Sequence, residues 1–339
     1  MKFGLFGGAR AKGGPAGDSY AYHDFVNYVV EAERLGFSSV FLVEHHFTGF
    51  GQVSASMSLL AYLAARTEKI RLGTAVVVLP WHNPVLVAEQ AATLDLLSNG
   101  RLDFGVGKGY RSYEFSGFCI PPEEAGERFD EAIEVIRKAW TAPGRFSHHG
   151  KRWKFDNIVV EPSPIQAPHP PFWLGAGSTE SIRRAACEGY NLLLDQIAPP
   201  DLAIDRVAAF KEECRRVGRR YDPAMVGVTR GLHIVHNESE RQRAIAIRRQ
   251  VLQNIGDLAR GPGAERYARI RDDEDAFVLD DAPLLGTPEE IIAQLKRLEA
   301  GGVEHVLFAA PGASVAHLRT FAEEIMPAFA EAPLALAQV

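Results

Sequence analysis

Short apolar runs alternate with longer segments of helical periodicity along most of this chain. Runs rich in β-branched and aromatic residues and bounded by polar or glycine-containing segments are typical of buried strands. The segments between them repeat apolar residues at helical spacing, which indicates amphipathic helices. The strands expected on this basis are 2–6, 39–43, 70–78, 102–106, 172–175, 191–194, 225–235 and 305–309.

Helices are expected between these strands, and several carry terminal signals. Gly36 follows the helix 20–35 where a C-terminal cap belongs, and Pro84 opens the helix 84–97. Thr287 precedes a proline and two glutamates, a combination that begins a helix ending at Gly301. The other helices are expected at 54–66, 123–140, 179–189, 202–218, 238–255 and 314–326.

Eight strand–helix alternations predict a parallel α/β fold in a single domain, residues 1–339. Because the count is eight, closure into a (β/α)8 TIM barrel is the economical interpretation, and a doubly wound open sheet is the alternative. Two insertions interrupt the alternation, after the fourth and seventh strands. Residues 145–164 are expected to form a hairpin, and 256–286 a mobile lid without long periodicity.

Composition narrows the class of protein. The chain is 46% hydrophobic and 24% charged with a formal net charge of −6, so it can bury a large core and has no basic footprint for nucleic acid. Three cysteines without CxxC or CxxH spacing indicate neither a zinc site nor a disulfide framework. No apolar run suits a signal peptide or a membrane span, so we expect a cytoplasmic protein without membrane attachment.

The end of the strand 39–43 carries the first candidate chemistry, Glu44-His45-His46. In a (β/α)8 barrel the working face lies at the carboxyl ends of the strands. Carboxylate and imidazole are metal ligands, but no HxH or HExxH pattern supplies further ligands, and adjacent side chains after a strand point to opposite sides. We therefore expect no metal and one histidine acting as acid, base or hydrogen-bond donor, with surface histidines as the plainer alternative.

Two glycine-containing loops follow other strands. Gly105-Val106-Gly107-Lys108-Gly109 matches neither the P-loop nor the dinucleotide-binding pattern. The loop from Gly175 to Thr179, with Ala176, Gly177 and Ser178, offers N–H groups and hydroxyls at a helix start and could bind an anion together with Lys108. An ordinary helix cap is the commoner use of such residues. Tyr110 is expected to line an apolar pocket beside this site.

Several motifs together resemble the bacterial luciferase-like flavin monooxygenase family. They include Leu94-Asp95-Leu96-Leu97-Ser98-Asn99-Gly100-Arg101-Leu102 and Gly286-Thr287-Pro288-Glu289-Glu290. The resemblance covers nearly the whole chain, and it is strong in the first 140 residues and poor from about 240 to 280. The other matching segments are 44–51, 72–80, 83–84 and 300–303.

The resemblance implies a set of site residues. His45 matches the family histidine beside the flavin, and Thr74-Ala75 matches a strand end close to the isoalloxazine, where the Ala75–Val76 bond is often a non-proline cis peptide. Lys108 stands where luciferases place an arginine near the FMN phosphate, and 175–179 matches the phosphate loop. Gly107 stands where luciferases carry a cysteine, so a role for that thiol is absent here.

The resemblance also implies a function. It predicts a monooxygenase that takes reduced FMN from a separate flavin reductase and reacts it with O2, through a flavin hydroperoxide, to oxidise a small organic substrate. A deazaflavin-dependent hydride-transfer enzyme and a non-catalytic flavin-binding protein are the alternatives. The family is usually dimeric, so a homodimer is expected, with His46 left for packing or for the interface, opposite Glu89.

Overall fold

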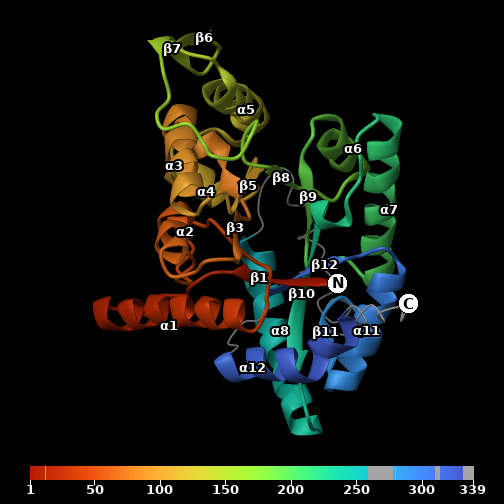
Figure 1. Ribbon diagram of the computed structural model, residues 1–339. Helices are drawn as coiled ribbons and strands as arrows, with labels where there is room; N and C mark the ends of the chain where they lie inside the picture. Colours follow the sequence, from red (N-terminus) through yellow and green to blue (C-terminus); the bar gives the residue numbers. More distant parts are fainter. Residues whose placement is uncertain (12, 259–277, 279, 310–313, 331–339) are drawn as a thin grey trace, which may run out of the picture.

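A closed ring of parallel strands forms the centre of the protein (Figure 1). The computed structural model describes residues 1–11, 13–258, 278, 280–309 and 314–330. Within this part, each barrel strand pairs with the next, and pairing of the sixth strand with the seventh closes the ring. The eight barrel strands of the described chain are β1 (Lys2–Gly7), β2 (Ser39–Leu42), β3 (Arg71–Thr74), β5 (Leu102–Gly107), β8 (Phe172–Gly175), β9 (Asn191–Leu194), β10 (Val226–Ile234) and β12 (His305–Ala309).

This topology confirms the predicted (β/α)8 barrel and excludes the open doubly wound sheet. Two details differ from the expected strands. The run 70–78 is divided into β3 and the short β4 (Val77–Val78), because a cis peptide bond between Ala75 and Val76 separates them. A further strand, β11 (Leu284–Gly286), pairs with the end of β10 outside the ring.

Helices surround the strands (Figure 1), and the terminal signals in the sequence correspond to observed caps. The Thr287 hydroxyl and the Glu290 carboxylate form a reciprocal capping box. Gly36 adopts the positive φ of 91° that follows the first helix. The helices described are α1 (Pro15–Arg34), α2 (Ser56–Ala64), α3 (Pro84–Leu97), α4 (Ser112–Gly117), α5 (Ala125–Thr141), α6 (Thr179–Cys187), α7 (Pro200–Arg216), α8 (Glu238–Leu258), α11 (Pro288–Ala300) and α12 (Val315–Thr320).

The first insertion is an antiparallel hairpin of β6 (Phe146–His149) and β7 (Lys154–Ile158) that lies against α5. The Glu131 carboxylate on α5 accepts hydrogen bonds from the backbone N–H groups of Arg152 and Trp153. The lid expected at 256–286 lies mostly outside the described residues. At its end, where no regular structure was expected, β11 is found.

Two apolar layers hold the barrel together. Phe41, Trp173, Leu193 and Leu307, from four different strands, pack against one another as a separate cluster inside the ring. The alternate residues of the same strands, such as Val40 and Leu42, belong to the larger core beneath the helices. Among the described helices, none is long and apolar enough to cross a membrane.

Gly73 has no side chain because the ring of Phe41 fills the space inside the barrel. A Cβ added to Gly73 would lie 2.3 Å from a Phe41 ring carbon. Gly73→Ala should therefore destabilise the protein by about 1–3 kcal/mol, the usual range for overpacking. Urea denaturation measures the change. Gly126→Ala in α5 is the matched control, because its Cβ meets nothing within 4 Å; equal destabilisation by both variants would contradict this account.

Candidate active site

Three half-buried apolar side chains form the floor at the barrel mouth. Phe6, Ala75 and Val76 pack against the inner cluster while part of each surface stays exposed. The Ala75 N–H donates to the Leu42 carbonyl at 2.7 Å, which ties the floor to β2. The Ala75–Val76 bond is cis, as the sequence resemblance implies.

Gly107, the last residue of β5, leaves room for the Val76 side chain at this floor. A Cβ on Gly107 would come within 2.4 Å of the Val76 side chain, so any larger residue there displaces it. A Cβ on Gly175, at the end of the neighbouring β8, would be in ordinary contact at 3.6 Å. The Val76 side chain therefore occupies the space beside Gly107.

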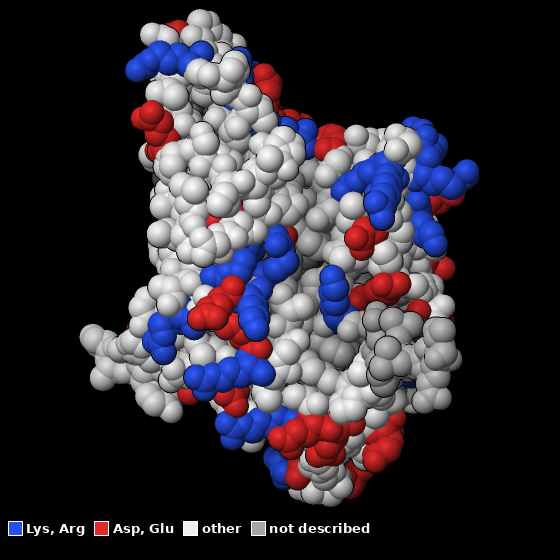
Figure 2. All heavy atoms as spheres, viewed as in Figure 1, with Lys and Arg blue, Asp and Glu red and all other residues white. Residues whose placement is uncertain are grey.

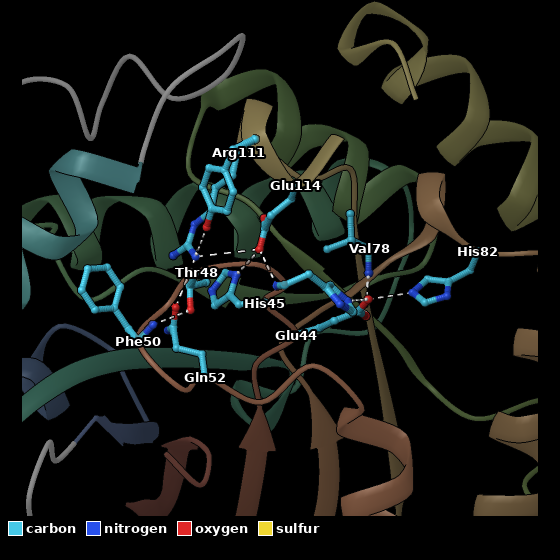
Figure 3. A network of polar contacts seen from close by, with 11 residues as sticks. Glu44, His45, Thr48, Phe50, Gln52, Val78, His82, Arg111 and Glu114 are labelled. Atoms are coloured by element: carbon cyan, nitrogen blue, oxygen red, sulfur yellow. Dashed lines mark hydrogen bonds and ion pairs between the residues drawn. The ribbon is translucent and has the colours of Figure 1, made fainter. Parts of the chain in front are cut away.

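His45 lies at the end of β2 and is held on two sides. Its backbone N–H donates to the Val53 carbonyl at 2.9 Å, and its Nδ1 lies 3.3 Å from Glu114 Oε1. Glu114, on α4, is buried and also accepts the His46 N–H at 2.8 Å (Figure 3). An ionised carboxylate accepts a hydrogen bond, so Nδ1 carries the proton of the imidazole and Nε2 keeps its lone pair.

Burial lowers the pKa of His45, and the nearby Arg111 guanidinium lowers it further, while Glu114 opposes both. The net direction is downward, so the imidazole is neutral at pH 7. A neutral imidazole whose Nδ1–H is engaged can accept a proton at Nε2 and return it. This is the chemistry of a general base.

Arg111 adds a buried cation that the sequence patterns did not single out. Its Nη1 donates to the Gln52 side-chain oxygen at 3.3 Å and to the Tyr113 hydroxyl at 3.1 Å, and it lies 3.9 Å from Glu114. The guanidinium also lies over the Tyr110 ring, 5.4 Å from its centre. Arg111 and Glu114 follow Gly109 in a run of polar and aromatic residues, and that composition after a strand was the available sequence signal.

A second hydrogen-bond network is centred on Glu44. The buried Glu44 carboxylate accepts hydrogen bonds from His46 Nε2 at 2.9 Å, His82 Nε2 at 2.7 Å and the Val78 N–H at 3.2 Å (Figure 3). Burial alone would raise the pKa of Glu44, but the two imidazoles outweigh it and lower the pKa. The network fastens β4 to the end of β2.

The two histidines therefore have different partners, His45 with Glu114 and His46 with Glu44. Within this chain the His46 ring lies between Glu44 and the aromatic side chains of Trp81 and Phe118, in agreement with the expected packing role, and a contact with Glu89 across an interface stays a prediction. Among the described residues, no group of three or more His, Cys, Asp or Glu side chains is arranged to hold a metal ion.

The loop after β8 is a helix cap with part of its donors already engaged. The Ser181 hydroxyl accepts from the N–H groups of Gly177 at 3.2 Å and Ser178 at 3.1 Å, and the Ser178 hydroxyl accepts the Ser181 N–H. Thr179 begins α6 at the surface, and Ala176 is buried. Gly177 and Ser178 thus take part in a helix cap, in which the Ser181 hydroxyl accepts from their N–H groups, and their place in a phosphate loop stays a prediction.

The remaining predicted residues lie around the mouth. Lys108 is exposed, and the register of β5 with β8 places it beside the loop that begins at Gly175. The Thr74 hydroxyl donates to the Gly105 carbonyl at 2.7 Å and so links β3 to β5, and its place beside the isoalloxazine stays a prediction. Tyr110 packs against Ile197, Leu252 and Val278, a small apolar cluster at the carboxyl side of the barrel.

A parallel barrel with a neutral imidazole, buried carboxylates and a buried guanidinium at the carboxyl ends of its strands is an enzyme architecture. The family match is more specific. The model of the family described as luciferase-like monooxygenase matches residues 1–305, and the chain belongs to that family. This confirms the resemblance and the prediction of an oxidoreductase.

Curated relatives match over most of the chain. The oxygenase component of a flavin-dependent trigonelline monooxygenase from Acinetobacter baylyi is 28% identical, over 98% of this chain and 96% of the relative. Limonene 1,2-monooxygenase from Rhodococcus erythropolis is 28% identical over 92% and 82%. An FMNH2-dependent dimethylsulfone monooxygenase from Pseudomonas putida is 26% identical over 81% and 79%.

Solved structures share the fold. Monooxygenase RslO1 from Streptomyces bottropensis aligns with a TM-score of 0.81 and 26% identity, over 97% of this chain and 100% of the other. An F420-dependent secondary alcohol dehydrogenase aligns with a TM-score of 0.79 and 19% identity, over 98% and 99%. At that identity the second likeness shows the fold alone.

Glu114→Gln should lower the pKa of His45 further, because the substitution removes the negative charge that favours the protonated imidazole. Histidine NMR titration measures this, with the His45 signal assigned by its loss in His45→Gln. Glu323→Gln, at an exposed position, is the matched control and should leave the titration unchanged. An unchanged or raised His45 pKa in Glu114→Gln would remove Glu114 from this role.

Proposed function

We propose that this chain is the oxygenase component of a two-component monooxygenase. It would take reduced FMN from a separate flavin reductase and use O2 to oxidise a small organic substrate. The observation that carries the proposal is His45, held by Glu114 with Nε2 unprotonated at the end of β2, next to an apolar floor. The three curated relatives named above, all monooxygenases, support it.

The residues at the mouth fit a flavin. The half-exposed floor of Phe6, Ala75 and Val76 suits a flat, largely apolar isoalloxazine ring. Lys108 and the exposed N-terminus of α6 at Thr179 suit a phosphate, because a cation and a helix start both favour an anion. We therefore assign Ala75 to the ring side and Lys108 with Thr179 to the phosphate side, with Gly175 between them.

Bound reduced FMN would supply the electrons that activate O2. The contribution of this chain is to control protons and water. His45 Nε2 accepts or returns a proton at the mouth, and Glu114 keeps the imidazole in one tautomer and orientation. The apolar floor excludes water from the side of the barrel interior.

Two alternatives share this fold. Deazaflavin-dependent hydride transfer is represented among the structural neighbours by the F420-dependent dehydrogenase. A flavin-binding protein without catalysis would keep the floor and the phosphate side but consume no O2. The proton-accepting geometry of His45 favours an enzyme over the second alternative. Free thiols at Cys119, Cys187 and Cys214 agree with the cytoplasmic location that we propose.

Anaerobic titration with reduced FMN and, separately, with reduced deazaflavin tests the cofactor, followed by admission of O2 with trigonelline, limonene or dimethylsulfone present. We expect reduced FMN to bind and O2 to be consumed. His45→Ala should bind reduced FMN as the wild type does, but release more of the consumed O2 as hydrogen peroxide and lower coupled turnover by about 10²–10⁴-fold.

The other possible results would establish one of the two alternatives or refute the role of His45. Binding of the deazaflavin alone would establish the hydride-transfer alternative, and FMN binding without O2 consumption would establish the non-catalytic one. Unchanged coupling in His45→Ala would refute the proton-transfer role.

We also propose that the protein is a homodimer through α2 and α3. The exposed face of α3 carries Leu86, Gln90, Thr93 and Leu97 without a charge, and Tyr62 on α2 is 44% exposed. In Figure 2 the surface over α3 and α4 is almost free of charged side chains, whereas basic side chains gather near the centre of the view. Apolar patches of this kind mark contact surfaces.

Light scattering after gel filtration tests the dimer. We expect a mass about twice 37.2 kDa for the wild type and a single-chain mass for the double variant Leu86→Glu, Leu97→Glu, since two buried charges per subunit would oppose association. Leu202→Glu on α7, where Leu202 is 44% exposed, is the control and should remain dimeric. A wild-type protein of single-chain mass would disprove the proposal.

A further inference from the structure

His233, near the end of β10, is a half-buried histidine to which the site described above gives no role. Its ring makes no hydrogen bond or ion pair with any residue of the described chain. This is unusual for the chain, because each of the other buried or half-buried histidines in the described part contacts an oxygen atom within 3.3 Å. Those histidines are His45, His46, His82, His148, His169 and His305.

The strand register places His233 on the inward face of β10. Thr229 of β10 is in register with Leu307 of β12, which belongs to the apolar cluster inside the ring. Side chains along a strand alternate between its two faces, so Gly231 and His233 face the same way as Thr229. A Cβ added to Gly231 would lie 4.0 Å from His233 Nε2, in agreement with this placement. The imidazole therefore faces the barrel axis.

The same register relates His233 to the apolar floor. Phe6 of the floor is in register with Ala309 of β12, and Ala309 is in register with Gly231 of β10. His233 lies two residues further toward the carboxyl end of β10, so its ring stands above the level of the floor. Only β12 separates β10 from β1, so Phe6 and His233 lie about 10 Å apart around the rim, since neighbouring strands are about 4.8 Å apart. Both side chains are partly exposed at this mouth, where one small molecule can contact both.

An apolar face of α8 lies beside His233. The charge of Arg248, on α8, acts on the His233 ring, and Ile245 and Leu252 lie one turn before and one turn after Arg248 on the same helix face. Ile245 and Leu252 belong to the apolar cluster that includes Tyr110. An apolar wall therefore extends from the neighbourhood of His233 to the loop after β5.

The chemistry beside this wall is uncharged. Burial, with smaller contributions from the charges of Arg248 and His317, lowers the pKa of His233 to about 4, so the imidazole is neutral at pH 7. Arg248 itself donates to the Asp280 carboxylate, and His317 Nδ1 lies 3.1 Å from the Ser314 hydroxyl. A neutral imidazole offers one N–H donor and one acceptor nitrogen. This position favours an uncharged ligand, because a charged one would lose its hydration without gaining a counter-ion.

We propose that His233 binds the substrate through a hydrogen bond to a hydroxyl or carbonyl oxygen, and that the substrate is an uncharged molecule whose apolar part lies against Tyr110 and Ile245. This inference rests on the proposed function, since it names the substrate class of that active site. It assigns proton transfer to His45, after β2, and substrate binding to His233 on β10.

Calorimetric titration of the flavin-free protein with cyclohexanone and with cyclohexanol tests this. We expect saturable binding of both probes, and histidine NMR should show a shift of the His233 signal, which is assigned by its loss in His233→Leu. Cyclohexanecarboxylate, a charged probe of similar shape, should bind more weakly than cyclohexanone, because no unpaired cation compensates for its desolvation.

Three variants separate binding from structure. His233→Leu should weaken the binding of cyclohexanone by about 2–12-fold, which corresponds to the loss of one hydrogen bond. His233→Gln keeps a donor and an acceptor and should restore most of the affinity. His236→Leu, at an exposed position shortly after β10, is the matched control and should bind as the wild type does.

Thermal unfolding without ligand provides the structural comparison. His233→Leu should have a Tm equal to or above that of the wild type, because its ring has no partner among the described residues. His305→Leu should lower the Tm, because it removes the contact of His305 Nε2 with the buried Ser39 hydroxyl at 2.9 Å. The proposal is overturned if neither probe binds, if His233→Leu binds cyclohexanone as tightly as the wild type, if the carboxylate binds most tightly, or if His233→Leu unfolds as early as His305→Leu.

Titration of His233→Leu with reduced FMN completes the test. We expect wild-type affinity, and loss of FMN binding would reassign His233 to the cofactor and overturn the proposal. Because the measurements with cyclohexanone need no flavin, failure of the wild type to bind FMN would refute the proposed function, while binding of cyclohexanone through His233 would still identify a site for uncharged ligands.

Discussion

Closure of the parallel barrel is the constraint on which the rest of this structure depends. Once β9 pairs with β10, all eight strands described in the ring bring their carboxyl ends to one rim, whatever their separation along the chain. His45, Lys108 and the loop after Gly175 lie at the same rim for this reason. Closure also leaves little room inside, which is why Gly73 stands opposite Phe41 and Gly107 opposite Val76.

Charge pairing among buried side chains then determines the protonation and orientation of the residues at the barrel rim. Glu44 accepts hydrogen bonds from His46, His82 and a backbone N–H. Glu114 contacts His45 and the His46 N–H and lies farther from Arg111. The contact with Glu114 orients the imidazole of His45, whereas burial and the Arg111 charge lower its pKa against the opposing effect of Glu114.

His233 departs from this pattern of paired side chains, and the departure is informative. A chain that gives His46 and His82 a shared carboxylate, and the buried His305 a hydroxyl, has the means to satisfy an imidazole. Proteins keep unfavourable arrangements mainly at functional sites, where a ligand compensates for them.

The sequence by itself determined the elements whose signals are local. Apolar periodicity identified the barrel strands, and caps located the ends of α3 and the start of α11, because propensity and capping act within a few residues. The end of the second strand marked Glu44-His45-His46 as candidate chemistry, and the family resemblance chose His45 between the two histidines. The sequence did not reveal the break between β3 and β4, the helix α4 inside the polar loop, or β11.

Only the tertiary structure decided which side chains meet. Glu114 lies 69 residues after its partner His45, and no spacing rule joins them. The N–H groups of Gly177 and Ser178 looked free in the sequence, but the Ser181 hydroxyl takes them. The place of His233 above the floor follows only from the register of three neighbouring strands. Periodicity is a property of neighbouring residues, whereas hydrogen bonding and desolvation depend on groups that folding brings together.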